Sequence, residues 1–194
     1  EIRNCDWSSD VCSSDLMADR LRHAEASGAR AVGLAKERLT PDKIMTPEAF
    51  ENALRVLLAV GGSTNAIVHL TAMAGRLGIE IDLDAFDKMG RETPVLVDLK
   101  PTGVGYMEDL EKAGGLVTVL REIRKQLNLD ALTVTGDTLG ENIKAAAPGW
   151  KQDIVRPFSD PIFKGGSIAV LRGNLCPDGA IIKQAADRKS TRLN

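Results

Sequence analysis

The sequence predicts an α/β protein that is helix-rich up to residue 148 and β-rich beyond it. Three observations predict this class. Apolar residues recur at helical spacing through much of the first part, and short apolar runs at 93–99 and 131–135 interrupt the helices. After Pro148 the helical pattern stops, prolines recur and short β-like runs appear. We therefore place a domain boundary near residue 149.

The first helices are predicted from composition and end signals. Residues 17–39 form a helix rich in Ala, Arg and Leu, with His23 on a solvated face. The next helix begins at Thr46, whose hydroxyl can cap it ahead of Pro47. Its core-facing stripe follows the spacing i, i+4, i+7 and i+8: Phe50, Leu54, Leu57 and Leu58. Gly61-Gly62 ends this helix and turns the chain into the next one.

The third helix carries apolar side chains all round its axis between residues 66 and 77. A helix that is apolar on every face is expected to be buried. Ser63 and Thr64 can cap its start, and Gly78 can cap its end. His69 lies one turn into this helix and has no visible acid–base partner, so we expect a hydrogen-bonded core histidine rather than a catalytic one.

Shorter elements follow in alternation. In order, the pattern predicts a helix over 82–89, a buried strand over 93–99, helices over 107–113 and 116–127, a strand over 131–135, a short helix started by a Thr138–Glu141 capping box, and β-like runs at 167–171 and 180–182.

Residues 61–65, Gly-Gly-Ser-Thr-Asn, form the first candidate site. Glycine allows positive φ, and free N–H groups at a helix start favour an anion. Gly62, Ser63, Thr64 and Asn65 could therefore bind a carboxylate. They could instead form a tight helix–helix turn in which the hydroxyls and the Asn65 amide only cap the helix.

Two strand-to-helix connections are further candidates, since ligands often bind where strands of an α/β fold end. One carries Asp98, Lys100, Tyr106, Glu108 and Asp109, and the other is 135–138. Acidic residues at a helix start also suit the helix dipole, and we favour that interpretation for the first connection.

Cysteine usage argues against an internal disulfide or a cluster site. Cys5 and Cys12 lie in residues 1–16, which show no helix or strand periodicity, so only Cys176 remains. We expect Cys176 to be structural rather than a metal ligand. Low cysteine content and the absence of a signal peptide suggest a reducing, cytoplasmic compartment.

Composition excludes several classes of protein. The net charge is −2 and 27% of residues are charged, so there is no basic footprint for nucleic acid. Aromatic residues make up 4%, too few for base stacking, and no apolar run approaches the about 20 residues that span a membrane. We expect no nucleic-acid and no membrane partner.

Four ordered segments resemble the dihydroxy-acid dehydratase family, which also contains the sugar-acid dehydratases. They are GGSTNAIVHLTAMAGRLGI at 61–79 and the segments at 93–116, 130–143 and 152–183. The resemblance implies that 17–148 is the C-terminal part of an α/β domain with a parallel sheet. It implies that 149–186 is the beginning of a β-barrel domain. Residues 1–16 and 187–194 fall outside the resemblance and are expected to be non-native or disordered tails.

The resemblance also implies a hydro-lyase that converts 2,3-dihydroxy acids, branched-chain or sugar acids such as a pentonate, into 2-keto-3-deoxy acids. Such enzymes use an iron–sulfur cluster, Mg²⁺ and a serine base, and the intact enzyme is expected to be a homo-oligomer. We can transfer no catalytic or metal-binding residue to this sequence, so the chain alone is expected to be inactive. The alternatives are a non-catalytic carboxylate-binding module and a structural module.

Overall fold

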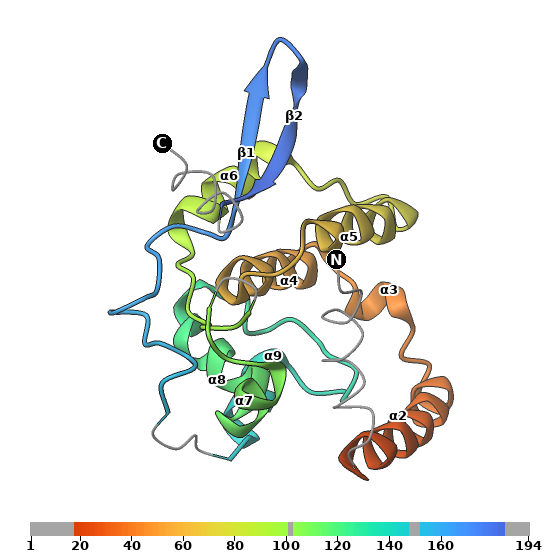
Figure 1. Ribbon diagram of the computed structural model, residues 1–194. Helices are drawn as coiled ribbons and strands as arrows, with labels where there is room; N and C mark the ends of the chain where they lie inside the picture. The colour runs from red at the N-terminus through yellow and green to blue at the C-terminus, as the bar shows by residue number, and fades with distance from the viewer. Residues whose placement is uncertain (1–17, 101–102, 148–151, 185–194) are drawn as a thin grey trace, which may run out of the picture.

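The computed structural model describes residues 18–100, 103–147 and 152–184 of the 194-residue chain. The terminal segments 1–16 and 187–194, for which we expect tails, lie outside the described residues. The described residues are helix-rich with one small antiparallel sheet, which agrees with the predicted class (Figure 1). The elements are, in order, α2 (Ala18–Glu37), α3 (Pro41–Ile44), α4 (Pro47–Val60), α5 (Thr64–Arg76), α6 (Leu83–Glu92), α7 (Met107–Lys112), α8 (Gly115–Glu122), the 3-10 helix η1 (Arg124–Gln126), α9 (Leu139–Ala145), β1 (Ile168–Gly173) and β2 (Cys176–Lys183).

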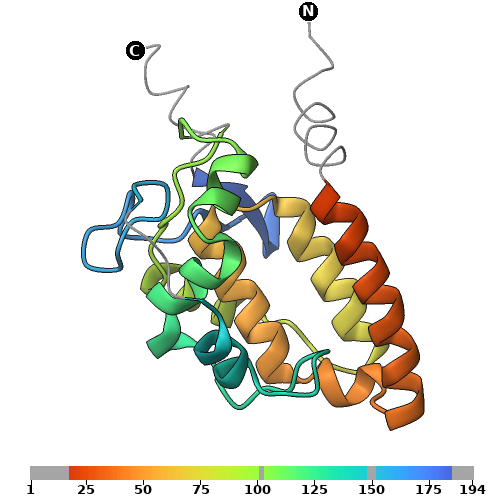
Figure 2. The ribbon, with the colours of Figure 1, turned by 90° about the horizontal axis from the view of Figure 1, so that it is seen from below.

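Helix α4 lies at the centre of the fold, with α7, α8 and α9 on one side and α6 and the hairpin on the other (Figures 1 and 2). Two apolar clusters include residues of this helix. The α8 cluster comprises Ala59, Leu96, Val97, Leu110, Ala113, Val119, Leu120, Ile123, Leu127, Ile143 and Val155. The α6 cluster comprises Leu54, Leu57, Leu58, Ile67, Phe86, Met89 and Ile168. Because α4 contributes to both clusters, it joins them into one core.

Local signals set the ends of α4 as predicted. The Thr46 hydroxyl accepts a hydrogen bond from the Ala49 N–H at 3.4 Å, and Pro47 occupies the first turn. Gly61 ends the helix in the left-handed conformation with φ of 70°. The predicted stripe of Phe50, Leu54, Leu57 and Leu58 is buried, which confirms the core-facing side.

The expectation that the third helix is buried is wrong for this chain. In α5 only Ile67 and Ala74 are buried, while Val68 is 63% exposed and His69 is also exposed. The helix packs against α4 and β2, and most of its residues are exposed. His69 is therefore a surface residue here, not a core histidine.

The segment at 93–99 is extended and buried, but it forms isolated bridges rather than a strand. Val97 pairs with Val155 and Val95 pairs with Phe163, both antiparallel. Between the two bridges, the opposite segment moves away from 93–99 and forms the loop 156–162. No continuous ladder of backbone hydrogen bonds can therefore develop. Leu96 instead donates its N–H to the Ala59 carbonyl at 2.9 Å, which fixes the segment to the end of α4.

The predicted strand at 131–135 is likewise reduced to one bridge, between Leu132 and Thr138. The capping box that follows is confirmed. The Glu141 N–H donates to the Thr138 hydroxyl at 3.2 Å, and the Thr138 N–H donates to the Glu141 carboxylate at 2.8 Å. The predicted helix at 116–127 also ends early, at Glu122, and continues as η1.

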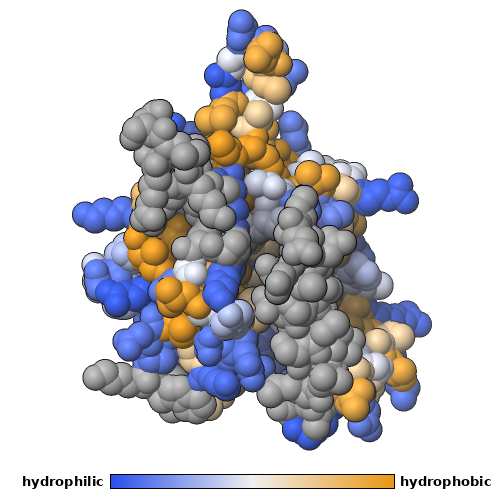
Figure 3. All heavy atoms as spheres, in the orientation of Figure 1, coloured by the Kyte–Doolittle hydropathy of each residue, from blue (hydrophilic) through white to orange (hydrophobic). Residues whose placement is uncertain are grey.

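The predicted β runs at 167–171 and 180–182 form the hairpin β1–β2, which projects from the helical body (Figure 1). It is antiparallel, with Ile168 opposite Lys183 and Val170 opposite Ile181. Its root is buried at Ile168, whereas Leu171 and Leu175 are 50% and 93% exposed. Apolar atoms accordingly extend up the hairpin in the space-filling view (Figure 3).

Candidate functional site

The corner, which we define as Gly61–Asn65, connects α4 to α5 as the sequence predicts. Gly61 provides the left-handed turn, and Ser63 is the N-cap residue of α5. The Ser63 hydroxyl accepts a hydrogen bond from the Asn65 N–H at 3.2 Å. The capping function is therefore present, whether or not the corner also binds an acid.

Gly62 allows close packing against Leu57 and does not adopt an unusual φ. A Cβ atom at Gly62 would lie 2.3 Å from the Leu57 Cδ1 atom and 3.3 Å from the Leu57 carbonyl oxygen. The Gly62 N–H donates to the same carbonyl at 3.0 Å. The absence of a side chain thus lets the chain turn back tightly over the last turn of α4.

The four predicted site residues differ in exposure. Ser63 and Asn65 are exposed, whereas Gly62 and Thr64 are half-buried. The corner therefore presents its polar side chains to solvent in the described part of the chain. That arrangement is open to a ligand or to a neighbouring segment.

Lys183, which the sequence reasoning missed, reaches the corner from the end of β2. Its ammonium group donates a hydrogen bond to the Gly61 carbonyl at 2.7 Å. The two residues are 122 positions apart. A basic residue after the apolar run 180–182 is visible in the sequence, but its tertiary partner leaves no local signal.

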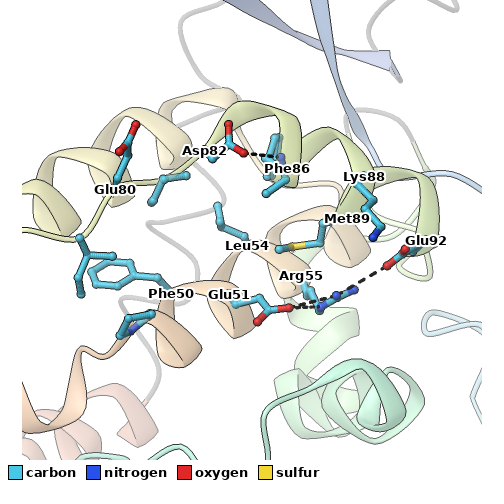
Figure 4. A pocket seen from close by; sticks show the side chains of 14 residues that line it. Phe50, Glu51, Leu54, Arg55, Glu80, Asp82, Phe86, Lys88, Met89 and Glu92 are labelled. Carbon is cyan, nitrogen blue, oxygen red and sulfur yellow. Dashed lines mark hydrogen bonds and ion pairs between the residues drawn. The ribbon is translucent and has the colours of Figure 1, made fainter.

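A pocket of about 440 Å³ lies elsewhere, between α4, α6 and the segment 79–82 (Figure 4). Its apolar wall includes Phe50, Leu54, Phe86 and Met89. The corner residues do not line it. Phe50 and Leu54 belong to the predicted core-facing stripe, and the pocket arises where α4 and α6 leave space between them.

The charges around this pocket disfavour an acid. Arg55 is only 13% exposed at its side chain and pairs with Glu51 at 3.1 Å and Glu92 at 3.8 Å. Glu80 and Asp82 also line the pocket, against one further cation, Lys88. Because carboxylates outnumber cations here, the corner with Lys183 is the better candidate for a carboxylate ligand.

The connection around 98–109 is held together by local contacts. The Asp98 carboxylate accepts a hydrogen bond from the Val104 N–H at 3.0 Å, and the Asp109 carboxylate accepts one from the Tyr106 N–H at 2.8 Å. Lys100 donates to the Tyr106 hydroxyl and lies 3.8 Å from the centre of its ring. The Asp109 contact confirms the helix-start interpretation that we favour.

The connection at 135–138 is similarly self-contained. The Asn142 side-chain amide donates to the hydroxyl of Thr133 at 2.8 Å and to that of Thr135 at 2.9 Å. Gly136 takes the left-handed conformation that the turn requires, with φ of 94°. These polar groups satisfy one another within the connection.

The described residues offer no ligand set for a metal or a cluster. No group of three or more His, Cys, Asp or Glu side chains lies close enough together in them to hold a metal ion. Cys176 is a free, exposed thiol at the start of β2. None of the described helices is long and apolar enough to cross a membrane.

Comparison with known proteins gives the family. Residues 10–142 match the N-terminal model of the dihydroxy-acid/6-phosphogluconate dehydratases, and residues 153–194 match the C-terminal model. The chain belongs to this family. The dehydratase resemblance inferred from four segments is therefore confirmed.

Individual dehydratases of the family are similar over most of the chain. Dihydroxy-acid dehydratase 1 of Methanosarcina acetivorans is 45% identical over 180 residues, 91% of this chain and 32% of its own length. L-arabinonate dehydratase of Rhizobium leguminosarum is 45% identical over 165 residues, 84% of this chain and 28% of its own length. L-arabonate dehydratase of Azospirillum brasilense is 46% identical over 166 residues, with the same coverage of 84% and 28%. The chain thus spans about a third of the length of these relatives.

Proposed function

We propose that this chain is part of a hydro-lyase that removes water from 2,3-dihydroxy acids to give 2-keto-3-deoxy acids. The observation that carries the proposal is the 45% identity, over 91% and 84% of the chain, to dehydratases of a dihydroxy acid and of a sugar acid. The small-molecule substrate is a carboxylic acid in both cases. Branched-chain and sugar acids remain the two candidate substrate classes.

Within this enzyme the corner is the proposed acid-facing wall, and Gly62, Ser63, Thr64 and Asn65 are its candidate substrate-binding residues. Ser63 and Asn65 are exposed polar side chains at the start of a helix of 13 residues, whose dipole favours an anion. The Lys183 ammonium group donates a hydrogen bond to the Gly61 carbonyl, at the start of the corner. These features support binding of a carboxylate there.

We further propose that the chain has the two-domain arrangement that the family resemblance implies. Residues 17–148 would be the C-terminal part of an α/β domain with a parallel sheet, and 149–186 the first strands of a β-barrel. The extended segment 93–99 and the hairpin β1–β2 supply backbone that further strands could join. The exposed Leu171 and Leu175 are apolar surface of the kind that such strands would cover.

The iron–sulfur cluster and Mg²⁺ implied by the family do not fit the described residues, which contain no ligand cluster. Residues outside the described part would have to hold them. We therefore derive no chemical step through either group, and we assign the corner only a role in binding and orienting the acid. A homo-oligomeric, cytoplasmic enzyme without nucleic-acid partners completes the proposal.

A segment exchange tests the proposal. The matching segment of the Rhizobium L-arabinonate dehydratase is replaced by this chain, and keto-acid formation is measured from L-arabinonate and from 2,3-dihydroxy-3-methylbutanoate. We expect turnover of at least one acid, and a change of preference relative to the parent enzyme indicates the substrate class that this segment favours. A soluble, folded chimera that dehydrates neither acid, beside an active parent enzyme, would contradict the proposal.

The 194-residue chain by itself is predicted to be inactive. Incubation with iron, sulfide, Mg²⁺ and L-arabinonate should give no keto acid above the blank, because the described residues provide no metal site. Measurable turnover would overturn this prediction. Gel filtration and binding of an apolar dye to the same sample separate the alternatives. Saturable acid binding by a compact monomer favours a binding module, and strong dye binding favours a structural piece with uncovered apolar surface.

A further inference from the structure

Lys183 forms a contact between two distant parts of the chain. Lys183 is the last residue of β2, and its side-chain amine donates a hydrogen bond of 2.7 Å to the carbonyl of Gly61. Gly61 lies in the region that matches the N-terminal family model, and Lys183 lies in the region that matches the C-terminal one. The contact thus joins the two regions at the corner.

The charge of Lys183 is not neutralised by the described residues. No carboxylate among them lies within ion-pair distance of its amine, and burial lowers the pKa of that amine below its usual 10.5. The other charged or titratable side chains on the elements that pack against β2 are His69 and Arg76 on α5 and Arg172 on β1. Arg172 pairs with Asp84. A half-buried ammonium group without an acid partner loses part of its hydration, and the hydrogen bond to Gly61 replaces part of that loss.

The acceptor of this bond, the Gly61 carbonyl, lies where it can affect the backbone conformation of the corner. Gly61 is the C-cap residue of α4, and the free carbonyls at a helix end attract cations. The next two residues lead directly to Ser63, the N-cap residue of α5. The orientation of the Gly61 peptide group therefore determines how Ser63 and Thr64 are presented.

We propose that Lys183 is a positioning residue for the acid-binding corner: its bond to the Gly61 carbonyl adds to the local contacts of Gly62 and Ser63, so that Ser63 and Thr64 are fully oriented only while the hairpin β1–β2 is docked. The inference rests on the proposed function of the corner. It adds Lys183, which lies in the region that matches the C-terminal family model. Lys183 acts on the substrate only through the backbone of Gly61. Docking of the hairpin and binding of the acid are then coupled.

The first test uses the ligand-free 194-residue chain, labelled with ¹³C and ¹⁵N. The Gly61 carbonyl and Gly62 amide signals should shift with pH along the same titration curve as the Lys183 side chain. Lys183→Met should displace the signals of the corner, and Lys183→Arg should restore them because arginine keeps the donor and the charge. Lys88→Met, which removes an equal charge from the exposed face of α6, is the matched control and should leave the corner unchanged.

The second test titrates the same samples with L-arabinonate. We expect Lys183→Met to weaken binding about tenfold, the effect of losing one charge-assisted hydrogen bond, and Lys183→Arg to recover most of it. Affinity of the unaltered chain should fall as pH rises through the pKa of Lys183. Binding that is independent of this residue would be insensitive to both changes.

Two results overturn the positioning role. One is a corner whose signals do not follow the Lys183 titration in the unaltered chain, a measurement that needs no variant to fold. The other is a folded Lys183→Met chain whose corner signals and affinity match the unaltered chain. If the corner follows Lys183 but L-arabinonate does not bind, the proposed acid-binding function fails instead, and the functional part of this inference fails with it.

Discussion

Asn52 illustrates how single side chains replace regular structure in this fold. It is buried within α4, and its amide bonds both backbone groups of Asn128. Asn52 Nδ2 donates to the Asn128 carbonyl at 3.0 Å, and the Asn128 N–H donates to Asn52 Oδ1 at 2.8 Å. A side chain thus supplies the pair of hydrogen bonds that a neighbouring strand would otherwise give.

Substitution of Asn52 by leucine is expected to destabilise the chain by about 1–3 kcal/mol, because two backbone groups of Asn128 lose their partners. Urea unfolding measures this change. Asn174→Leu, at an exposed residue of the hairpin turn, is the control and should have little effect. An Asn52→Leu chain as stable as the unaltered one would show that water satisfies Asn128 instead.

The capping box at Thr138 gives a prediction in pH. Hydrogen bonds from the Thr138 N–H and hydroxyl hold the pKa of the Glu141 carboxyl below its usual 4.5. Because the pKa is lowered in the folded state, this contribution is complete above pH 4.5 and is lost as pH falls through the lower, folded value. NMR should show the Thr138 amide signal moving in that range. In Glu141→Gln, which cannot titrate, the movement should be absent.

At the scale of elements, the root of the hairpin packs against α6 through two glycines. A Cβ atom at Gly166 would lie 2.8 Å from the Gly90 carbonyl oxygen and 3.0 Å from the Gly90 Cα atom. Both neighbours are backbone atoms, which cannot rotate away. The chain before β1 can approach α6 this closely only without a side chain at Gly166.

Gly166→Ala is therefore expected to push the hairpin root away from α6 and to cost about 1–3 kcal/mol. Hydrogen exchange of the β1 and β2 amides, together with urea unfolding, measures both effects. Gly173→Ala is the matched control, since nothing lies within 4 Å of a Cβ atom there. Equal exchange rates in the two variants would contradict the close packing at Gly166.

At the scale of the whole molecule, α4 makes the two apolar clusters one cooperative unit. Leu58 is fully buried in the α6 cluster, and its neighbour Ala59 is fully buried in the α8 cluster. We therefore expect a change on one side of the helix to affect the packing on the other. The chain should unfold in a single transition although its elements divide into two groups around α4.

Leu58→Ala is expected to destabilise the whole chain by about 2–5 kcal/mol through the lost contacts and the cavity. Methyl signals of Ile143 in the α8 cluster and Ile168 in the α6 cluster report the two sides during urea unfolding. Their midpoints should fall together. A shift of the Ile168 transition alone would show two independent units, and Leu175→Ala, at a 93% exposed side chain, is the control.

Features that depend on neighbouring residues could be predicted from the sequence, and features that depend on distant partners could not. The caps at Thr46 and Thr138, the end of α4 at Gly61 and the hairpin strands all follow from local patterns. The exposure of His69 and the bridges at 93–99 depend on which segments lie alongside. The contact of Lys183 with Gly61 spans 122 positions, and no periodicity encodes it. For the candidate site, the turn and its cap were therefore predictable, whereas the cation beside them was not.

The close contact of Gly62 with Leu57 affects how these two positions can vary among related sequences. A larger residue at position 62 needs the space that the Leu57 side chain now fills, so the two positions are not free to change separately. In an alignment of dehydratases, sequences with alanine or serine at position 62 should carry a smaller or differently branched residue at position 57. Such paired replacement would mark this bend as an inherited constraint on the whole lineage.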